Sequence, residues 1–386
     1  MGGGPSKETV RIRLGSEDEH AIRDDFLDGA LEVTSPRGVR GPERILLDAL
    51  DQKVEGRVLV VGTREGLGAL AVGKLFPEAE VHLLSFDAYE HRRAFQALGK
   101  NPTANVRPRL AGDLPGDGSF DWVILPVSHC GEGMLSGELL RDAHGTLKDR
   151  GKILAATDGA RDRWLHDRID DIFGAVTIHL RAKHGLAYVA RKRPGREPRR
   201  RDFRKRFQAA VLGRTLELET RPGVFSHGEL DEGTLALSEV ATVGESSRVL
   251  DLGCGSGALG IAAALAAPRG HALLVDSSAR AVRVARENIV RNGAGGNAVA
   301  ILGCDLAAAR EGAFDLALAN PPYYGDYRIL EMFSREAFRV LAPGGDLFLV
   351  TKTPERPQEI FRGLFGSSRA VNRRGYTILC GRKRPS

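Results

Sequence analysis

The stretch Val249-Leu-Asp-Leu-Gly-Cys-Gly-Ser-Gly257 joins a short apolar run to a glycine-rich loop, and a second apolar run, Ala258–Ala266, follows directly. The first run is typical of a buried strand and the second of a helix. Glycines allow a tight turn and a close approach of a ligand to the backbone. The start of a helix also offers free N–H groups to a carboxylate or a phosphate. The stretch therefore predicts a strand–loop–helix unit with a ligand site at its loop.

A weaker copy of this pattern lies in the first half of the chain. Val58-Leu-Val-Val-Gly-Thr-Arg-Glu-Gly66 resembles the glycine stretch, and further matching pairs follow in the same order at nearly constant spacing. These pairs are Phe120–Leu125 with Phe314–Ala319, Leu147–Leu154 with Leu341–Phe348, and Ala190–Pro194 with Gly381–Pro385. Landmarks repeated in order indicate a gene duplication followed by divergence.

Both halves alternate strand-like and helix-like segments. In the second half the strand-like runs are Arg248–Leu252, Ala272–Val275, Ala298–Leu302, Phe314–Ala319, Leu347–Thr351 and Tyr376–Cys380, and the helical runs are Ala258–Ala266, Ala279–Asn292 and Leu330–Leu341. This alternation predicts an α/β protein with two tandem Rossmann-like domains, each a doubly wound and mainly parallel sheet. We expect the tail after Arg373 to return as an antiparallel strand.

Three segments follow from this organisation. We expect residues 1–190 to form a degenerate copy of the domain, residues 191–220 to form a basic linker, and residues 221–386 to form the catalytic domain. Residues 1–40 show no pattern beyond a polar tail, and Glu43–Leu50 is typical of a short amphipathic helix.

The composition excludes several classes of protein. The chain has 386 residues, 42% hydrophobic and 27% charged, which is the profile of a globular protein with room for two domains. No apolar run approaches the roughly 18 residues of a membrane span, and the N-terminus lacks the apolar segment of a secretion signal. The four cysteines are scattered with no Cys-x-x-Cys pair, which disfavours zinc and disulfides. We expect a cytoplasmic protein with no membrane segment and no metal.

Acids and glycines mark the expected ligand site. Asp251 ends the first strand, Asp276 ends the second, and Asp305 follows a third strand-like run. Asp276 is placed to accept hydrogen bonds from both ribose hydroxyls of a nucleoside, as an acid does in dinucleotide sites. Gly255–Gly260 also fits the dinucleotide pattern G-x-G-x-x-G, so a nicotinamide-dependent oxidoreductase remains open on this motif alone.

A second motif, Asn320-Pro321-Pro322-Tyr323, directly follows the strand-like run Phe314–Ala319. The two prolines make a stiff loop at the end of the strand where ligands bind in such sheets. The Asn320 oxygen and a backbone carbonyl, that of Pro321, can hold both N–H bonds of one –NH2 group, while Tyr323 stacks on the attached ring. A conjugated nitrogen is a poor nucleophile, so positioning and preorganised acceptors supply the catalysis that it needs.

The complete set resembles the class I S-adenosylmethionine-dependent methyltransferases, whose first motif has the form D-x-G-x-G-x-G. The resemblance implies S-adenosylmethionine as the cofactor. It also accounts for the second motif, Asn320–Tyr323, which the oxidoreductase interpretation leaves unexplained. Asp251 belongs to the motif, and the further cofactor-binding residues that it implies are Gly253, Gly255 and Gly257 under the methionine moiety, Asp276 at the ribose and Asp305 beside the adenine. In this superfamily [N/D]-P-P-[Y/F/W/H] marks methylation of adenine N6, guanine N2 or a glutamine amide.

Two segments narrow the resemblance. Arg221-Pro-Gly-Val-Phe-Ser226 and Leu230-Asp-Glu-Gly233 resemble the P-G-V-F-S and L-D-x-G segments of the ribosomal RNA guanine-N2 methyltransferases, the small-subunit methyltransferase C and large-subunit methyltransferase G family. Members of this family carry a degenerate duplicate domain at the N-terminus. The resemblance implies transfer of a methyl group to guanine N2 in ribosomal RNA, alone or in a subunit. The family often has Phe and His after the two prolines, where this chain has Tyr323 and Tyr324.

The first half lacks the residues of this chemistry. Val60 stands in the place of Asp251, Thr63-Arg-Glu65 interrupts the glycines, and Pro126-Val-Ser-His129 replaces the proline motif. We expect Arg64 and Glu65 to obstruct the methionine part of a cofactor pocket. Asp87 and Asp113 remain near useful positions, and we interpret this half as a substrate-binding or scaffolding domain.

A basic stretch lies between the halves. Arg191–Arg206 holds ten Lys or Arg residues against two acids, although the whole chain carries a formal charge of only +6. Such a stretch suits phosphate contacts, and a solvated linker is the alternative. Phe203 and Phe207 either stack on bases or anchor the segment. The residues expected to contact RNA are Arg199, Arg200, Arg201, Arg204, Lys205 and Arg206.

The sequence thus favours a monomeric enzyme that acts on ribosomal RNA. The enzyme alternatives are methylation of adenine N6 in nucleic acid and of a glutamine amide in a protein factor. An alternative of another class is a nucleic-acid-binding scaffold with a vestigial site.

Overall fold

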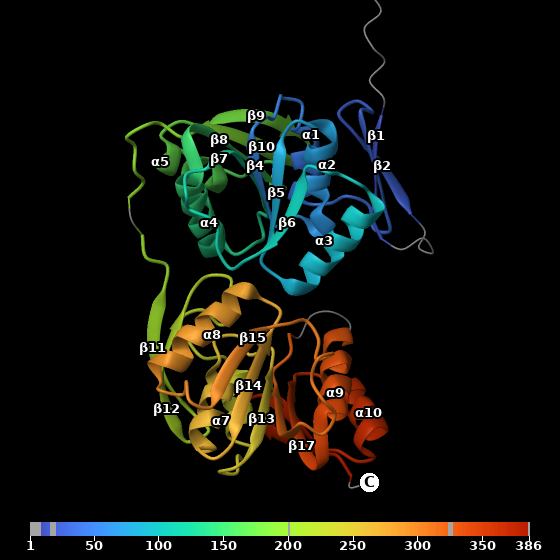
Figure 1. The fold of residues 1–386 in the computed structure, drawn as a ribbon, viewed down its shortest axis with the longest axis vertical. Helices are drawn as coiled ribbons and strands as arrows, with labels where there is room; N and C mark the ends of the chain where they lie inside the picture. The colour runs from blue at the N-terminus through green and yellow to red at the C-terminus, as the bar shows by residue number, and fades with distance from the viewer. Residues whose placement is uncertain (1–8, 16–20, 200, 323–326, 385–386) are drawn as a thin grey trace, which may run out of the picture. The chain divides into compact units, whose positions relative to one another are not determined.

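The computed structural model describes residues 9–15, 21–199, 201–322 and 327–384. The chain divides into two compact units, unit 1 (Met1–Asp202) and unit 2 (Phe203–Ser386). In each unit a seven-stranded sheet carries helices on both faces (Figure 1). This confirms the predicted fold class of two tandem doubly wound domains.

The elements of unit 1 follow the expected alternation. Its strands are β1 (Val10–Arg13), β2 (Ile22–Phe26), β3 (Leu31–Ser35), β4 (Arg57–Val61), β5 (Glu80–Ser85), β6 (Val106–Leu110), β7 (Phe120–Val127), β8 (Leu147–Thr157), β9 (Thr177–Ala182) and β10 (Gly185–Arg191). Its helices are α1 (Pro42–Asp48), η1 (Arg64–Gly66), α2 (Leu67–Leu75), α3 (Ala88–Lys100), α4 (Gly133–Thr146) and α5 (Trp164–Phe173).

The elements of unit 2 begin with two strands that the sequence analysis did not predict. The strands are β11 (Lys205–Val211), β12 (Arg214–Thr220), β13 (Arg248–Leu252), β14 (His271–Asp276), β15 (Ala298–Leu302), β16 (Phe314–Ala319), β17 (Leu341–Thr351), β18 (Arg369–Arg373) and β19 (Tyr376–Arg382). The helices are α6 (Glu232–Ser238), α7 (Ala258–Ala266), α8 (Ala279–Arg291), α9 (Arg328–Val340) and α10 (Glu355–Phe365).

The two large sheets have the same topology. Their strand orders are β6-β5-β4-β7-β8-β10-β9 and β15-β14-β13-β16-β17-β19-β18. The first five strands of each order are parallel, and the last two pair antiparallel, as β17 with β19 and β19 with β18 in unit 2. The predicted return of the tail after Arg373 is therefore confirmed, and the shared order supports the duplication.

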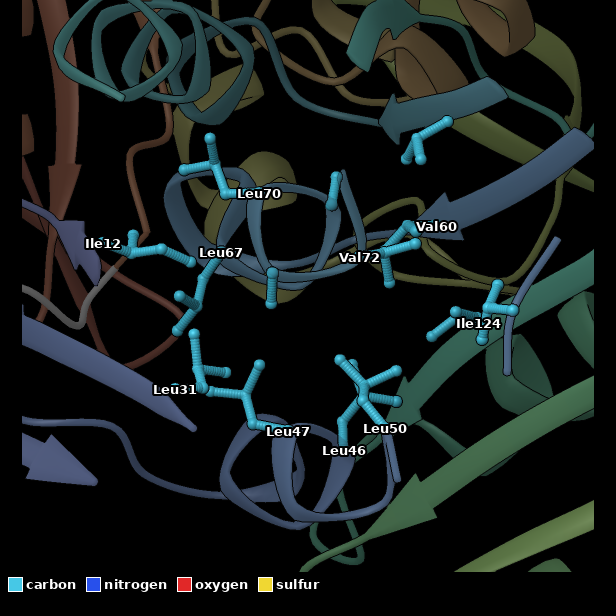
Figure 2. Packing of buried hydrophobic residues seen from close by; sticks show 14 of the residues in the cluster. Ile12, Leu31, Leu46, Leu47, Leu50, Val60, Leu67, Leu70, Val72 and Ile124 are labelled. Atoms are coloured by element: carbon cyan, nitrogen blue, oxygen red, sulfur yellow. The ribbon is translucent and has the colours of Figure 1, made fainter. Parts of the chain in front are cut away.

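The N-terminal segment forms a small sheet that the sequence analysis did not foresee. β3 pairs parallel with β1 and antiparallel with β2. Ile12 and Leu31 of this sheet lie in one apolar cluster with Leu47 of α1 and Leu67 of α2, as Figure 2 shows. The expectation of a mere polar tail was wrong for these residues, because the alternating charged residues of β1 and β2 hide the few apolar side chains that are buried.

Helices cover both faces of the unit 2 sheet with separate apolar clusters. One cluster holds side chains of α6, α7 and α8 together with the β11–β12 hairpin. The other holds side chains of α9 and α10, among them the fully buried Phe361. Both faces of β13 and β16 are thereby covered, so their carboxyl ends open only at the edge of the sheet, where ligands bind in this architecture.

The boundary between the units corrects the predicted linker. It lies between Asp202 and Phe203, inside the segment expected to be a linker, and Lys205–Thr220 forms a hairpin of unit 2. Leu212 and Gly213 form its turn at positive φ, 48° and 71°, the backbone that a two-residue hairpin turn requires. Phe203 is 9% exposed and Phe207 packs on the cluster beneath the hairpin, so both side chains anchor the segment.

Candidate active site

The glycine loop of unit 2 connects β13 to α7 at the centre of the sheet. The N–H groups of Gly253 and Cys254 donate to the Val275 carbonyl, at 2.8 and 3.1 Å, which fixes the loop to the end of β14. Gly257 has φ +86°, and a Cβ there would lie 3.1 Å from Leu274 and 3.2 Å from Ala285, so only glycine fits without displacement. Gly255 has φ +55° and would meet nothing within 4 Å, so its face of the loop is open.

Asp251 is almost wholly buried beneath this loop. The residue is 1% exposed, and its side-chain Oδ2 accepts a hydrogen bond from the Gly260 N–H of α7 at 2.8 Å. Burial raises the pKa of Asp251 to about 7, against the lowering effect of that N–H group. Asp251 therefore joins strand to helix, and we expect any influence on a ligand to act through the loop.

Asp276 and Asp305 occupy the ends of the next two strands outward. Asp276 is half-buried, and its two carboxylate oxygens accept hydrogen bonds from the N–H groups of Gly255 and Ser278, both at 2.8 Å. Asp305 is exposed, and its Oδ1 accepts from the Ala307 N–H at 3.3 Å. The Gly303 N–H donates to the Asp276 carbonyl at 2.9 Å, so the two acidic segments lie side by side.

Asn320 follows β16 and is held by two partners at the N-terminal end of α6, its N-cap Asp231 and Thr234. Its Nδ2 donates to Asp231 Oδ2 at 2.7 Å and to Thr234 Oγ1 at 3.0 Å. Asp231 caps α6 and accepts the Thr234 N–H at 3.0 Å, so the same carboxylate fixes both the helix start and the amide. Because an amide NH2 has two donors, these contacts use both of them. The amide oxygen Oδ1 is then the group that Asn320 can present as an acceptor.

The rest of the proline motif is only partly described. Pro321 is buried and Pro322 is half-buried. Tyr323 lies outside the residues that the structure describes, so the predicted stacking stays a prediction.

A narrow cavity joins the glycine loop to Asn320. Among its lining residues are Asp251, Gly253, Gly255, Asp231, Thr234 and Asn320. Phe225 also lines it with 59% of the residue exposed. The structure thus brings four of the ten predicted cofactor-binding and catalytic residues, Asp251, Gly253, Gly255 and Asn320, into the lining of one cavity. Asp276 and Asp305 lie outside this lining, along the strand ends.

Asp231, Thr234 and Phe225 are the residues whose place in the site the sequence analysis missed. All three belong to, or adjoin, segments that were noticed only as family resemblances, Arg221–Ser226 and Leu230–Gly233. Asp231 before a helical run is a capping signal, but nothing in the sequence indicates that its carboxylate also reaches Asn320.

The basic stretch is partly engaged by acids of unit 2. Glu219, whose side chain is 4% exposed, pairs with Arg204 at 2.8 Å, Arg206 at 2.5 Å and Arg291 at 3.1 Å. Arg199 is exposed, and its carbonyl accepts from the Arg141 side chain at 3.2 Å. Lys205 is exposed beside Gly228. Arg201 is exposed, and Arg200 lies outside the described residues.

The corresponding loop of unit 1 is closed by its own side chains. The Arg64 N–H donates to the Glu43 carboxylate, whose pKa burial raises to about 7. Glu65 is 6% exposed, pairs with Arg93 of α3 and accepts the Gly15 N–H at 3.2 Å. We expected the side chains of both Arg64 and Glu65 to obstruct the pocket. Only Glu65 is buried and makes contacts that block the loop, whereas Arg64 is exposed.

The retained acid Asp87 does not stand in the place of Asp276. It is the N-cap of α3, accepting from the N–H groups of Tyr89 and Glu90, as Ser278 caps α8. The strand position that matches Asp276 holds Ser85, because β5 pairs with β4 in the register in which β14 pairs with β13.

Comparison with known proteins identifies the family. Residues 215–380 match the methyltransferase small domain family. Ribosomal RNA large subunit methyltransferase G of Ectopseudomonas mendocina is 33% identical over 69% of this chain and 71% of its own length. Ribosomal RNA small subunit methyltransferase C of Chromohalobacter salexigens is 40% identical over 67% of this chain and 75% of its own length.

The chain belongs to this family of ribosomal RNA methyltransferases. A solved member, the 16S rRNA N2 G1207 methyltransferase of T. Thermophilus in complex with AdoMet and guanosine, is 25% identical and has a TM-score of 0.72. The match covers 90% of this chain and 93% of that one. The family resemblance predicted from the sequence is thereby confirmed for both units.

Membrane-spanning helices and metal-binding clusters are both absent from the part of the chain that the structure describes. No helix is long and apolar enough to cross a membrane. In the same residues, no group of three or more His, Cys, Asp or Glu side chains could hold a metal ion.

Proposed function

We propose that unit 2 transfers the methyl group of S-adenosylmethionine to the exocyclic N2 of a guanine in ribosomal RNA. The observation that carries this proposal is the fixed amide of Asn320. With both Nδ2 donors bound to Asp231 and Thr234, Oδ1 serves as an acceptor beside the open face of the glycine loop. An acceptor at that place suits an –NH2 group.

The residues at the glycine loop fit the cofactor. Gly255 has open space where any Cβ would stand, and the loop faces the cavity with backbone atoms alone at Gly253 and Gly255. We assign Gly253, Gly255 and Gly257 to the methionine moiety, Asp276 to the ribose hydroxyls and Asp305 to the adenine. When bound, the cofactor supplies a methyl group on a positively charged sulfur.

The protein's part in the reaction is to hold the acceptor nitrogen. Asn320 Oδ1 accepts one N–H of the amino group and the Pro321 carbonyl accepts the other, which directs the nitrogen lone pair to the methyl group. As the nitrogen–carbon bond forms, the bond between the methyl carbon and the cofactor sulfur would break and leave its electron pair on sulfur. The positive charge that develops on the nitrogen is stabilised by the same two acceptors. One N–H proton is then acidic enough to leave to water, so no strong base is required.

The choice of guanine rests on the relatives. The names of the related proteins describe ribosomal RNA methyltransferases, and the solved member acts at N2 of a guanine and was solved with guanosine. A paired guanine must leave its helix to reach this loop, which costs a few kcal/mol. We infer that a monomer acts in the cytoplasm on ribosomal RNA, in which the phosphate backbone offers contacts that offset this cost.

We assign part of that backbone contact to the basic stretch. Arg199, Arg201 and Lys205 are exposed; Arg204 and Arg206 are exposed as well, but their guanidinium groups pair with the buried carboxylate of Glu219. The first group is accordingly better placed to meet phosphates, and the second group holds the hairpin. Each phosphate contact removed from a duplex lowers the log–log salt dependence of binding by about 0.9.

Product analysis tests the proposed function directly. Purified protein is incubated with labelled S-adenosylmethionine and ribosomal RNA, and the RNA is digested to nucleosides. Label in N2-methylguanosine is the expected result. Label in N6-methyladenosine, or in protein with none in RNA, contradicts the proposal and moves the acceptor to adenine or to a glutamine amide.

A further inference from the structure

Unit 1 contains a cavity at the place that corresponds to the acceptor side of the active site. It has a volume of about 490 Å³ and lies where β7 and β8 end. Its lining includes Val127, His129, Ser136, Arg161, Asp162 and Trp164. The segment Pro126–His129 of this wall stands in the repeat where unit 2 has its proline motif. A cavity of this size, outside the carboxyl ends of parallel strands, is in the range of small-molecule sites.

The two sides of this ancestral site have diverged differently. On the cofactor side, Glu43 binds the loop N–H of Arg64 and Glu65 is buried against Arg93. On the acceptor side, the cavity is not filled by side chains in this way. Gly131, Gly133 and Gly159, which have no side chains, form part of its lining. Cβ atoms at Gly133 and Gly159 would lie 3.7 Å from Trp164 and 3.1 Å from His129. The unit has thus closed the cofactor cradle while the neighbouring cavity remains.

The lining combines an aromatic face with a cation and polar groups. Trp164 is 37% exposed. Arg161 is exposed and has no ion-pair partner in the parts of the chain that the structure describes. His129 is held in place because Asp158 Oδ1 lies 3.0 Å from its Nδ1 and accepts its backbone N–H at 2.8 Å. Ser128 and Ser136 add hydroxyl groups.

We propose that this cavity binds one nucleotide of the RNA substrate. The base stacks on the indole of Trp164, the phosphate pairs with Arg161, and the serine hydroxyls and His129 contact the polar edges. Stacking on an aromatic ring tolerates any base, and an arginine pairs well with phosphate oxygens. The choice of RNA as the source of the nucleotide rests on the proposed function, whereas the nucleotide site itself rests on the cavity.

Tryptophan fluorescence offers a direct test in the full-length protein. The chain has two tryptophans, and the other, Trp122, is 4% exposed, so a stacked base quenches mainly Trp164. Guanosine, adenosine and uridine monophosphates are titrated separately, with inorganic phosphate as the comparison. We expect saturable quenching by all three nucleotides, little by phosphate, and none by nucleotide in Trp164→Phe.

A matched pair of arginine variants tests the phosphate contact. Arg161→Ala keeps the tryptophan and should weaken the nucleotide affinity roughly tenfold, since a hydrogen bond to a charged group is lost. Arg163→Ala removes another exposed arginine, which does not line the cavity, and should leave the affinity unchanged. In methyl transfer, Arg161→Ala should raise the KM for RNA and leave kcat unaltered.

The outcomes separate this proposal from the proposed function. Absence of saturable quenching, equal quenching by phosphate, or equal loss in both arginine variants would overturn the nucleotide site, even if N2-methylguanosine is formed. Quenching that depends on Trp164 and Arg161 supports the site, even if the labelled product proves to be another nucleoside or no RNA product appears.

Discussion

The two glycine loops of this chain share a scaffold and differ in what their N–H groups bind. In both units the first loop glycine donates to the end of the neighbouring strand, Gly62 to Leu84 at 2.9 Å and Gly253 to Val275 at 2.8 Å. Two residues later the loops diverge. The Gly255 N–H binds Asp276, the acid that we assign to the ribose, whereas the Arg64 N–H binds Glu43, a residue of helix α1.

The strand ends diverge in the same way. Ser85 stands where unit 2 has Asp276, and Pro126 stands where it has Asn320, while both sheets keep the same order and register. Buried strands and helix contacts therefore maintain the same fold in unit 1 without the residues that we propose for the reaction. The two units differ at a few side chains at the strand ends, where we propose that the chemistry of unit 2 lies, and they share the scaffold.

The largest expected effect follows from the acceptor residue. Asn320→Ala should lower kcat roughly 10²- to 10³-fold, because one preorganised acceptor of the developing charge is removed. Cofactor affinity, measured by calorimetry, should change little. Pro126→Ala, at the matching position of unit 1, should leave kcat unaltered. Loss of cofactor affinity in Asn320→Ala equal to the loss of kcat would contradict the assigned role.

The next effect concerns the cofactor. Asp276→Ala should weaken S-adenosylmethionine binding roughly 10- to 100-fold, since hydrogen bonds to a charged acceptor are lost and the Gly255 N–H loses its partner. Ser85→Ala in unit 1 is the matched control and should bind normally. Calorimetry on the full chain should give one cofactor per chain. Two sites per chain, or equal weakening in both variants, would show that unit 1 still binds the cofactor.

A smaller effect is expected from the residue that orients the amide. Thr234→Val has nearly the same shape and removes the hydroxyl acceptor of the Asn320 amide, so kcat should fall about tenfold with cofactor affinity unchanged. Thr234→Ser keeps the hydroxyl and should restore most of kcat. If valine and serine at this position reduced kcat equally, the loss would come from packing in α6, and the orienting role would be wrong.

Much of this comparison could be predicted from sequence. The strands Arg248–Leu252, Ala298–Leu302 and Phe314–Ala319 and the helix Ala258–Ala266 have the predicted bounds, because each is a short apolar run between glycine or polar signals. β17 begins at Leu341, earlier than the predicted Leu347, because the turn-like residues before Asp346 join the strand.

The parts that were missed have a common physical cause. In the β11–β12 hairpin, exposed residues alternate with half-buried or buried ones over Arg206–Val211 and Thr215–Leu218, and the surrounding positive charge concealed this period of two. Glu219 is an example: this charged residue is buried because three arginines pair with it, and a local sequence pattern does not report such pairs. The contact of Asp231 with Asn320 joins residues 89 positions apart, and no local pattern reports such a pair.

The last comparison concerns two acids whose pKa is raised by burial, the half-buried Glu43 beside the unit 1 loop and the fully buried Asp251 beside the unit 2 loop. Burial raises the pKa of Glu43 in unit 1 and of Asp251 in unit 2 to about 7. In the folded chain these groups hold a proton that the unfolded chain releases near its ordinary pKa, so their contribution to stability is present at low pH and is lost as the pH rises towards 7. Glu43→Gln and Asp251→Asn should each flatten this loss, by about 2 to 3 kcal/mol between pH 5 and pH 8. Urea unfolding at each pH measures this change in the free energy of unfolding. Because both tryptophans lie in unit 1, fluorescence follows the unfolding of unit 1 and reports the effect of Glu43→Gln, while circular dichroism follows both units. The exposed Glu78→Gln is the control and should follow the unaltered protein. If Glu43→Gln and Asp251→Asn kept the full pH dependence, the carboxyl groups would be ionised in the folded chain and the buried-acid account of both loops would fail.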